Sequence, residues 1–249
     1  MLEKVDLTKK ISKEEYKAKM PQMEIELGRL QRECRELKIP VMIVFEGFGA
    51  SGKGVQIGKL IQSMDPRGFQ VFPIKAETED ERMHPFLWRF WTKTPEAGRI
   101  AIFDGSWYRK VLIDRFEKRT REKEIETAFH SIEAFEKQLT DGGTILVKLL
   151  LDIDQKEQKK RFEKLLEKKE TAWRVSQGDR ERNAKYSEYA AMMEEVLYRS
   201  DTKSAPWTVI EATDRRFATV KIYMTVIHAL AEAVEAVQRR RMEEQAIKA

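Results

Sequence analysis

The sequence predicts an α/β protein in which parallel strands alternate with helices. Three observations support this class. Five apolar runs have the length of buried strands, at 41–45, 69–75, 99–104, 144–153 and 206–212. Amphipathic or strongly polar segments of helical length separate them, and a glycine-rich loop directly follows the first run. Strands that are apolar throughout are typical of a parallel sheet covered on both faces.

A helix is expected before the first strand, in an N-terminal extension over residues 1–38. Ser12 and Glu15 have the spacing of a capping box, and Pro21 suits the first turn of the helix that follows. The buried stripe of that helix has apolar residues at alternating spacings of four and three, namely Met23, Leu27, Leu30, Cys34 and Leu37. We expect this helix to pack on the outside of the domain or against a partner subunit.

The later helices are placed between the remaining strands. One is expected over 106–139 with a charged interruption at 115–124, and the glycines at 142 and 143 end it. A very polar helix is expected over 154–170, another from 177 to 199, and a closing amphipathic helix over 217–237. The last dozen residues are expected to be a fraying helix end. Because no repeat or low-complexity linker interrupts this order, residues 1–249 are assigned to one domain.

The glycine loop after the first strand has the pattern of a phosphate-binding loop. Gly47, four further residues, Gly52 and Lys53 match GxxxxGK between a buried strand and an amphipathic helix. Glycines allow successive backbone N–H groups to face one phosphate, and the positive end of the helix and the Lys53 ammonium add to the attraction. The expected binding residues are Gly47, Gly49, Ala50, Ser51, Gly52 and Gly54. A plain glycine turn is the alternative.

Gly54 stands where this motif usually has a Ser or Thr hydroxyl that holds Mg2+. A metal would therefore need a protein ligand from elsewhere, and Asp104 at the end of the third strand is the best candidate. Carboxyl ends of strands face the ligand crevice in open α/β sheets. The alternative is that Asp104 only caps the helix that begins near 106.

Positive charge around a transferring phosphoryl group is expected from several later residues. The candidates are Lys75, Arg89, Arg109, Lys110, Arg115, Lys118, Arg119 and Arg121. Those in the segment from about 109 to 125 suggest a mobile lid that closes over a polyanion. A solvated helix of alternating charges explains the same segment equally well. The aromatic run 85–91 is more typical of core packing than of base stacking.

Composition limits the other function classes. The 249 residues include 47 Lys and Arg, 42 Asp and Glu, and a single cysteine. An intrachain disulfide is therefore impossible, and the three scattered histidines form no catalytic or zinc pattern. The net charge of +5 is weak evidence for nucleic acid. No apolar run reaches the length of a membrane span, and we expect a cytoplasmic protein.

Several motifs together resemble one family. They are FEGFGASGKG, PIKAETEDE, HPFLWRFW, GRIAIFDGSWYRKVLIDR, TAWRVSQGD and SAPWTVIEATD. In this order they resemble the family-2 polyphosphate kinases, and within them the polyphosphate:AMP phosphotransferase branch. The likeness spans about residues 20 to 235.

The resemblance implies a three-layer α/β/α P-loop kinase fold, similar to thymidylate kinase, with a five-stranded parallel sheet and a helical lid. It implies Mg2+-dependent phosphoryl transfer between inorganic polyphosphate and an adenine nucleotide, by a homo-oligomer such as a dimer or tetramer. Lys53 would contact the transferring phosphoryl group, and Asp104 would bind Mg2+ or the acceptor phosphate. Lys75, Arg89, Lys110 and Arg115 would line the anion channel.

Two residues depart from the family pattern. Gly49 replaces an Asp of the loop, and Gly105 replaces an Arg that follows the strand-end acid. Three hypotheses stay open: an active polyphosphate:nucleotide phosphotransferase, a weakened or inactive protein that binds polyphosphate or nucleotide, and an ATP-dependent nucleoside monophosphate kinase.

Overall fold

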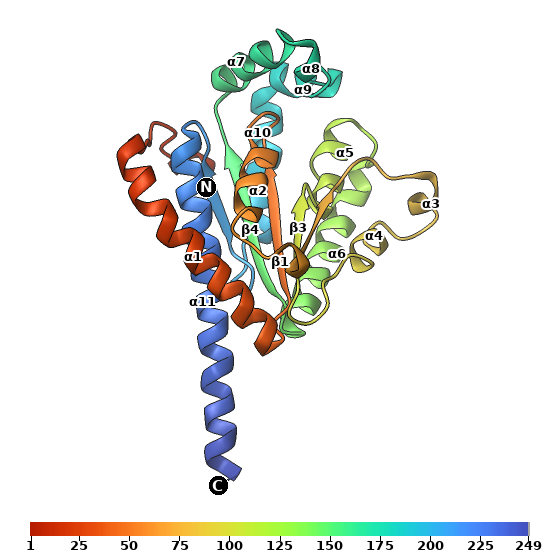
Figure 1. Cartoon of the computed structure of the whole chain (residues 1–249). Helices are drawn as coiled ribbons and strands as arrows, with labels where there is room; N and C mark the ends of the chain where they lie inside the picture. Colours follow the sequence, from red (N-terminus) through yellow and green to blue (C-terminus); the bar gives the residue numbers. More distant parts are fainter. Residues whose placement is uncertain (249) are drawn as a thin grey trace.

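The computed structural model describes residues 1–248 and contains a five-stranded parallel sheet (Figure 1). The strand order is β2-β3-β1-β4-β5, and all four pairings are parallel. The strands are β1 Val41–Gly47, β2 Phe69–Pro73, β3 Ile100–Asp104, β4 Ile145–Asp152 and β5 Trp207–Glu211. Helices cover both faces, so the predicted three-layer α/β/α class is confirmed.

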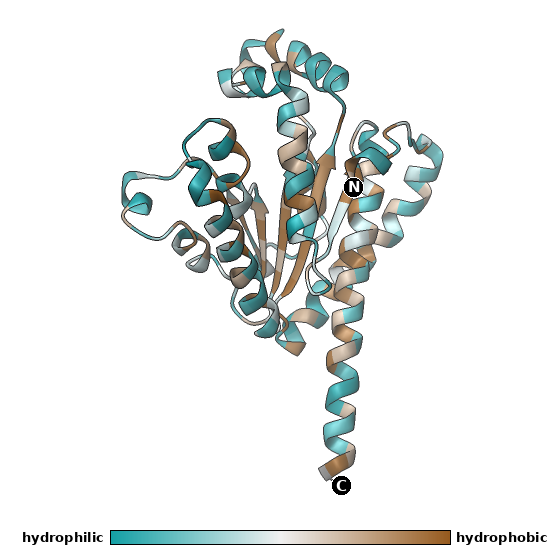
Figure 2. Cartoon of the chain, turned by 180° about the vertical axis from the view of Figure 1, so that it is seen from behind, coloured by the Kyte–Doolittle hydropathy of each residue, from teal (hydrophilic) through white to brown (hydrophobic). Residues whose placement is uncertain are grey.

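Burial explains why the strands could be found from composition. Every residue of β1 is buried, and β4 is buried from its second residue onward. The edge strand β2 is only half buried and ends at Pro73, two residues earlier than expected. Figure 2 shows the result, with apolar strands enclosed by helices whose outer faces are hydrophilic.

Helices α1 Lys13–Leu37, α2 Lys53–Ile61 and α11 Arg215–Lys248 form one outer layer, with α1 packed along α11 (Figure 1). The Ser12 capping box is confirmed, and Leu27, Leu30 and Cys34 of the predicted stripe are fully buried. The expected place of Pro21 was wrong, because it lies inside α1 and not in the first turn. The Ser12 cap starts the helix two turns earlier.

The opposite layer contains α6 Glu122–Asp141 and α10 Tyr186–Ser200, together with the short helices α4 Trp88–Trp91 and α5 Ile113–Phe116. The single helix expected over 106–139 is in fact three elements, the 3-10 helix η3 Trp107–Lys110, α5 and α6. Lys118 has a φ of 57°, a left-handed conformation that no α-helix accommodates. That residue separates α5 from α6.

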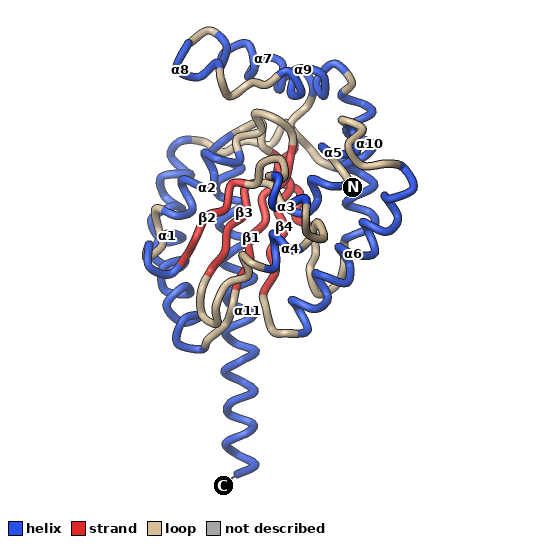
Figure 3. The backbone as a smooth tube through the Cα atoms, turned by 90° about the vertical axis from the view of Figure 1, so that its right-hand side faces the viewer, coloured by secondary structure: helices blue, strands red, loops and turns tan. Residues whose placement is uncertain are grey.

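Three helices cross above the carboxyl ends of the strands, as Figures 1 and 3 both show. They are α7 Gln155–Leu166, α8 Lys169–Ala172 and α9 Gln177–Ala184, and we call them the helical cover. Residues 155–185 carry eleven Lys and Arg against six Asp and Glu. This excess of five equals the net charge of the whole chain.

Helix α11 is longer than predicted and continues past 237 to Lys248, projecting beyond the sheet (Figures 1 and 3). Within residues 1–248, its Arg215–Ile247 part is the one segment long and apolar enough to cross a membrane by length and composition. Half of its most apolar window is buried against the rest of the protein, and α11 packs on β4, β5 and α1. A core helix of a folded domain has the same properties. The remaining short elements are η1 Leu2–Lys4, η2 Pro66–Gly68 and α3 Glu79–Arg82.

Candidate functional site

The glycine loop, residues 47–54, joins β1 to α2 at the carboxyl edge of the sheet. Gly47 has a φ of 139°, and a Cβ there would lie 2.3 Å from the carbonyl oxygen of Leu151 on β4. Only glycine permits this approach of two strands. Gly52 has a φ of 106° and is the N-cap of α2, without a side-chain cap. The loop therefore ends in a helix N-terminus that no side chain covers.

Each carbonyl group from 47 to 52 accepts a hydrogen bond from within the protein. The donors, in order, are Lys53 Nζ at 3.0 Å, Ser51 N at 3.1 Å, Gln158 Nε2 at 3.0 Å, Arg161 at 3.1 and 3.0 Å for two successive carbonyls, and Gln56 N at 3.0 Å. The acceptors of the loop are thus fully used by the chain itself.

The N–H groups differ: those of Phe48 and Ser51 bond to the carbonyls of Leu151 and Phe48, whereas those at the start of α2 are uncapped. The first turn of α2 begins at Lys53, and the first amides of any helix have no intrahelical acceptor. With the carbonyls directed at protein donors, these amides and the helix dipole leave a positive concavity of the kind that binds phosphate. The predicted residues Gly47, Gly49, Ala50, Ser51, Gly52 and Gly54 all lie in this loop and the first turn of α2, and their binding of an anion stays a prediction. The hydroxyl of Ser51 is buried and has no hydrogen-bond partner among residues 1–248.

Asp104 faces this loop. It ends β3 beside Phe45 of β1, and a Cβ placed on Gly54 would lie 4.0 Å from Asp104 Oδ2. The alternative role as a helix cap is excluded, because the N-cap of η3 is Ser106, whose side chain accepts from Tyr108 N. Asp104 is therefore available to a ligand of the loop.

Glu46 is a second carboxyl group at the same place, and sequence reasoning missed it. Burial raises its pKa, whereas the hydroxyl of Ser106, donating to Oε1 at 2.7 Å, and the Lys53 charge act in the opposite direction. A charged residue at the end of an otherwise apolar strand was the available signal. Glu46, Lys53 and Asp104 together form the polar floor of the site.

Lys75 and Arg89 lie beyond β2 and act on each other. Arg89 is buried, donates to the Lys75 carbonyl at 3.2 Å and forms an ion pair with Glu81 at 3.2 Å. Its charge is thus used to hold the connection from β2 to α3. Among residues 1–248 the Lys75 ammonium group has no hydrogen-bond or ion-pair partner, so of this pair Lys75 is the one able to meet an anion.

Arg109, Lys110 and Arg115 follow β3 and have different surroundings. Arg109 Nε lies 3.2 Å from Asp114, and Arg115 forms ion pairs with Glu195 on α10 at 2.5 Å and with Glu122 at 3.3 Å. Arg115 therefore ties α5 to α10 and α6, and no contact brings it to the glycine loop. That the segment at about 109–125 moves as a lid over a polyanion stays a prediction. The segment that contacts the loop in this structure is the helical cover.

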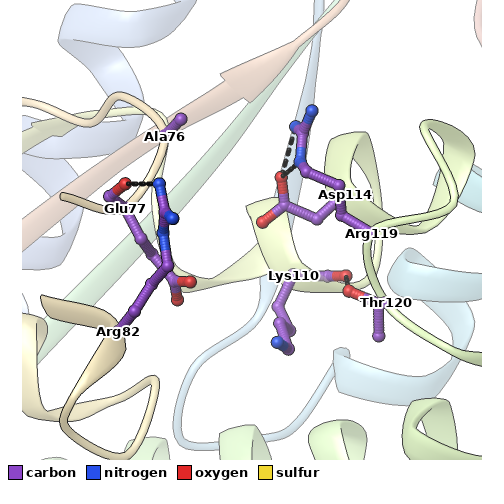
Figure 4. A pocket seen from close by; sticks show the side chains of 7 residues that line it. All are labelled: Ala76, Glu77, Arg82, Lys110, Asp114, Arg119 and Thr120. Atoms are coloured by element: carbon purple, nitrogen blue, oxygen red, sulfur yellow. Dashed lines mark hydrogen bonds and ion pairs between the residues drawn. The ribbon is translucent and has the colours of Figure 1, made fainter. Parts of the chain in front are cut away.

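Lys110 lines a cavity of about 390 Å³ between the β2–α3 connection and the segment after η3 (Figure 4). Figure 4 shows Arg82 bonded to Glu77 on one wall and Arg119 bonded to Asp114 on the other. The cavity is lined by Ala76, Glu77, Arg82, Lys110, Asp114, Arg119 and Thr120. It opens at the carboxyl edge of β2 and β3 and carries both signs of charge.

The helical cover contributes residues that the sequence did not identify. Gln158 and Arg161 of α7 bond to the loop, as given above, and Asp179 of α9 lies over Gly49. A Cβ on Gly49 would be 2.9 Å from Asp179 Oδ1. Asp179 is itself held by Arg182 at 2.8 Å, and Arg182 by Glu117 at 2.6 Å. Because residue 49 has no side chain, the helical cover can pack directly against the loop.

Comparisons with known proteins agree on one family. The family model described as Polyphosphate kinase 2 (PPK2) matches residues 10–239. The polyphosphate:AMP phosphotransferase of Pseudomonas syringae pv. tomato is 36% identical over 94% of this chain and 47% of its own length. That of Acinetobacter johnsonii is 32% identical over 86% of this chain and 44% of its own length. The chain thus spans about half the length of these curated relatives.

A solved structure gives the same result at the level of the fold. The crystal structure of Polyphosphate Kinase 2 from Arthrobacter aurescens TC1 superposes with a TM-score of 0.87 and is 30% identical. The superposition covers 93% of this chain and 85% of that one. The sheet and its helices are therefore shared with that structure.

Proposed function

This chain belongs to the polyphosphate kinase 2 family, and from that premise we propose that it transfers a phosphoryl group between inorganic polyphosphate and a nucleotide, with AMP as the acceptor that becomes ADP. In this reaction an oxygen of the AMP phosphate bonds to the terminal phosphorus of polyphosphate. The phosphoanhydride bond between that phosphorus and the rest of the polyphosphate breaks, and the polyphosphate leaves one phosphate shorter. Further transfer from ADP to ATP uses the same chemistry.

The observation that carries the proposal is the polarity of the glycine loop. All carbonyl groups from 47 to 52 are bonded to protein donors, and the amides of Phe48 and Ser51 bond to carbonyls, so the uncapped α2 N-terminus is the part of the loop left for the phosphoryl group. Phosphoryl transfer requires little of a protein except positioning and charge stabilisation. Lys53 supplies the ammonium group, and removing one such donor commonly costs 10² to 10³ in rate.

We propose Mg2+ as the metal at Asp104. The carboxyl groups of Asp104 and Glu46, which lie close enough to interact, supply the hard oxygen donors that Mg2+ prefers. When bound, the ion would neutralise phosphate charge during transfer. Asp104 would hold it, and Lys53 would remain the cation contributed by the chain.

The acceptor nucleotide is assigned to the cavity beside Lys110. Its volume of about 390 Å³ lies within the usual range for a small-molecule site. Lys110 supplies positive charge near the acceptor phosphate, and Glu77 and Asp114 offer hydrogen-bond acceptors to a base or ribose. This assignment predicts that Glu77→Ala changes the KM for AMP more than the KM for polyphosphate.

The test is a donor and acceptor screen on the purified chain. Protein, Mg2+ and polyphosphate are incubated with AMP or ADP, and parallel reactions contain ATP in place of polyphosphate. We expect ADP from polyphosphate and AMP, abolished in Lys53→Ala and retained in Lys19→Ala, an exposed lysine of α1 distant from the site. Tight polyphosphate binding without turnover would instead favour the binding protein suggested by Gly49 and Gly105. Faster turnover with ATP would favour the monophosphate kinase.

We further propose that the protein acts in the cytoplasm as a dimer or tetramer, without nucleic acid or membrane as a partner. Light scattering on the eluted peak of a sizing column tests the subunit number. A monomer with full activity would contradict the oligomer.

A further inference from the structure

Arg161 of α7 is the residue whose contacts the proposed reaction does not explain. It is buried, with 8% of its side chain exposed, although it lies among lysines that face solvent. A guanidinium group has five N–H bonds and no acceptor. All five are used within the protein, so none remains for a phosphate.

The five bonds join three parts of the fold. One nitrogen donates to the carbonyls of Ala50 at 3.1 Å and Ser51 at 3.0 Å, in the glycine loop. The other terminal nitrogen donates to the carbonyls of Ala212 and Thr213, at 2.8 and 2.9 Å, just after β5. Nε donates to Glu157 at 2.7 Å, one turn earlier in α7. Arg161 thus links the glycine loop to the helical cover and to the residues that follow the edge strand β5.

The conformation next to these carbonyls explains why they matter. Ala50 has a φ of 57°, a left-handed conformation that is unfavourable for alanine. The peptide groups on either side of Ala50 are held at the Gly49 carbonyl by Gln158 and at the Ala50 carbonyl by Arg161. Since N–H and C=O point in opposite directions across a peptide, fixing the Ser51 carbonyl toward α7 directs the amide of Gly52 away from α7, whereas the amide of Ser51 bonds to the Phe48 carbonyl and holds the turn of the loop.

We propose that Arg161 is a positioning residue that sets the orientation of the glycine-loop peptides, with Gln158 as its partner at Gly49, and that it does not bind the anion itself. The proposal rests on the proposed function for the identity of that anion. The proposal predicts that the loop requires the planar, forked geometry of the Arg161 guanidinium group and not its positive charge. Lysine keeps the charge but cannot span four carbonyls in a plane.

The experiment compares Arg161→Lys and Arg161→Gln with Lys164→Gln, which removes an exposed lysine from the same helix. Tripolyphosphate binding is measured by calorimetry, well below the melting temperature of each protein. Hydrogen exchange is followed at the amides of Ser51 and Gln56, which bond to the carbonyls of Phe48 and Gly52. A purely stabilising role would lower the melting temperature without affecting either measurement.

We expect both Arg161 variants to bind tripolyphosphate about 10- to 100-fold more weakly and to exchange both amides at least about tenfold faster, with Lys164→Gln unchanged. Wild-type affinity in Arg161→Lys together with weak binding in Arg161→Gln would mean a direct charge contact and would overturn the proposal. Wild-type affinity in both variants would overturn it as well.

If neither Arg161 variant folds, Gln158→Met removes the bond to the Gly49 carbonyl, together with the bond that Asn183 Nδ2 donates to Gln158 Oε1 within the helical cover. It should weaken tripolyphosphate binding several-fold and speed exchange at Ser51, and no change would refute the proposal. If the wild-type protein itself does not bind tripolyphosphate, the proposed function fails. The role of Arg161 is then decided by the exchange rates alone, and unchanged rates would refute it.

Discussion

Two lysines lie in largely buried polar clusters, and their surroundings differ. Lys148 of β4 is completely inaccessible, and its Nζ donates to Glu136 at 2.7 Å, Tyr108 at 3.2 Å and the Ser200 carbonyl at 2.6 Å. Lys53, at the glycine loop, has one donated bond among residues 1–248, to the Gly47 carbonyl at 3.0 Å.

The difference distinguishes architecture from function. In the Lys148 cluster every donor meets an acceptor, since Glu136 also accepts from Trp107 Nε1 at 2.9 Å. At the loop, among residues 1–248, the Ser51 hydroxyl has no partner and the Lys53 ammonium donates a single bond, and the first amides of α2 have no intrahelical acceptor. A closed polar cluster can only stabilise the fold, whereas an open one has capacity for a ligand. Equal substitutions at the two lysines should therefore have opposite consequences.

The largest effect is expected for Lys148→Met. It leaves the Glu136 carboxylate buried without its cation, which typically costs about 3–5 kcal/mol of folding free energy. Urea unfolding followed by circular dichroism measures the loss. Lys148→Met combined with Glu136→Leu should recover part of it, because no buried charge remains. A loss below about 1 kcal/mol would show that this cluster is not closed.

Lys53→Met should affect activity and leave stability almost unchanged. Turnover should fall by about 10² to 10³, because a preorganised donor to the transferring phosphoryl group is lost. The free energy of unfolding should change by less than about 0.5 kcal/mol, since a single partly exposed bond is removed. Comparable losses of stability at Lys53 and Lys148 would remove the distinction between the two clusters.

Asp152, at the end of β4 next to the loop, gives a pH-dependent test. Burial, and secondarily the charges of Asp154 and Glu211, raises its pKa to about 6. A carboxyl group whose pKa is higher in the folded state favours folding when protonated. This contribution is therefore complete below about pH 4 and lost as the pH rises through 6, by up to about 3 kcal/mol.

Asp152→Asn removes that ionisation. The variant should be more stable than the wild type at pH 7.5, and the difference should shrink toward pH 4.5. Thermal unfolding across this range is sufficient to measure it. Parallel pH profiles for the two proteins would contradict the assignment to Asp152.

The smallest effect is expected at Gly49. A Cβ there would meet Asp179 Oδ1 at 2.9 Å and Phe162 at 3.2 Å, so Gly49→Ala must displace the cover slightly, at about 1 kcal/mol. Asp179→Ala should relieve the carboxylate part of this clash, and a double-mutant cycle measures the coupling. Additive effects would mean that the cover does not rest on the loop. Gly49→Asp should lower activity, because it brings two carboxylates together.

Much of the fold was predictable from local pattern. β1 and β4 are apolar because both faces of each strand are covered, and strands buried in this way can be recognised from composition alone. The glycine loop follows from a motif whose spacing is dictated by phosphate geometry, and the choice of Asp104 follows from its place at the carboxyl end of a strand. The helix expected over 106–139 is divided in the structure, where Lys118 has a left-handed conformation. Hydrophobic periodicity does not reveal such a conformation, so the division was not predicted.

The rest of the site depends on residues that meet only after folding. Lys159, Lys160 and Arg161 are adjacent basic residues, and no local pattern tells which one turns inward to carbonyls some 110 positions earlier. Arg89 and Arg115 were expected near the anion because of their charge, yet both are committed to nearby carboxylates. The charge of a residue does not show whether it will pair with a carboxylate of the protein or with a ligand.

Residues 155–185, which include the helical cover and its connections, hold the entire formal charge excess of the chain, and the remaining residues balance to zero. The long-range field of the protein therefore originates from a structure that stands directly above the strand ends. An approaching polyanion would be steered toward that edge by diffusion in this field, and association would slow as ionic strength rises. Neutralising exposed lysines of α7 should thus reduce the rate of encounter and leave the rate of dissociation nearly unchanged.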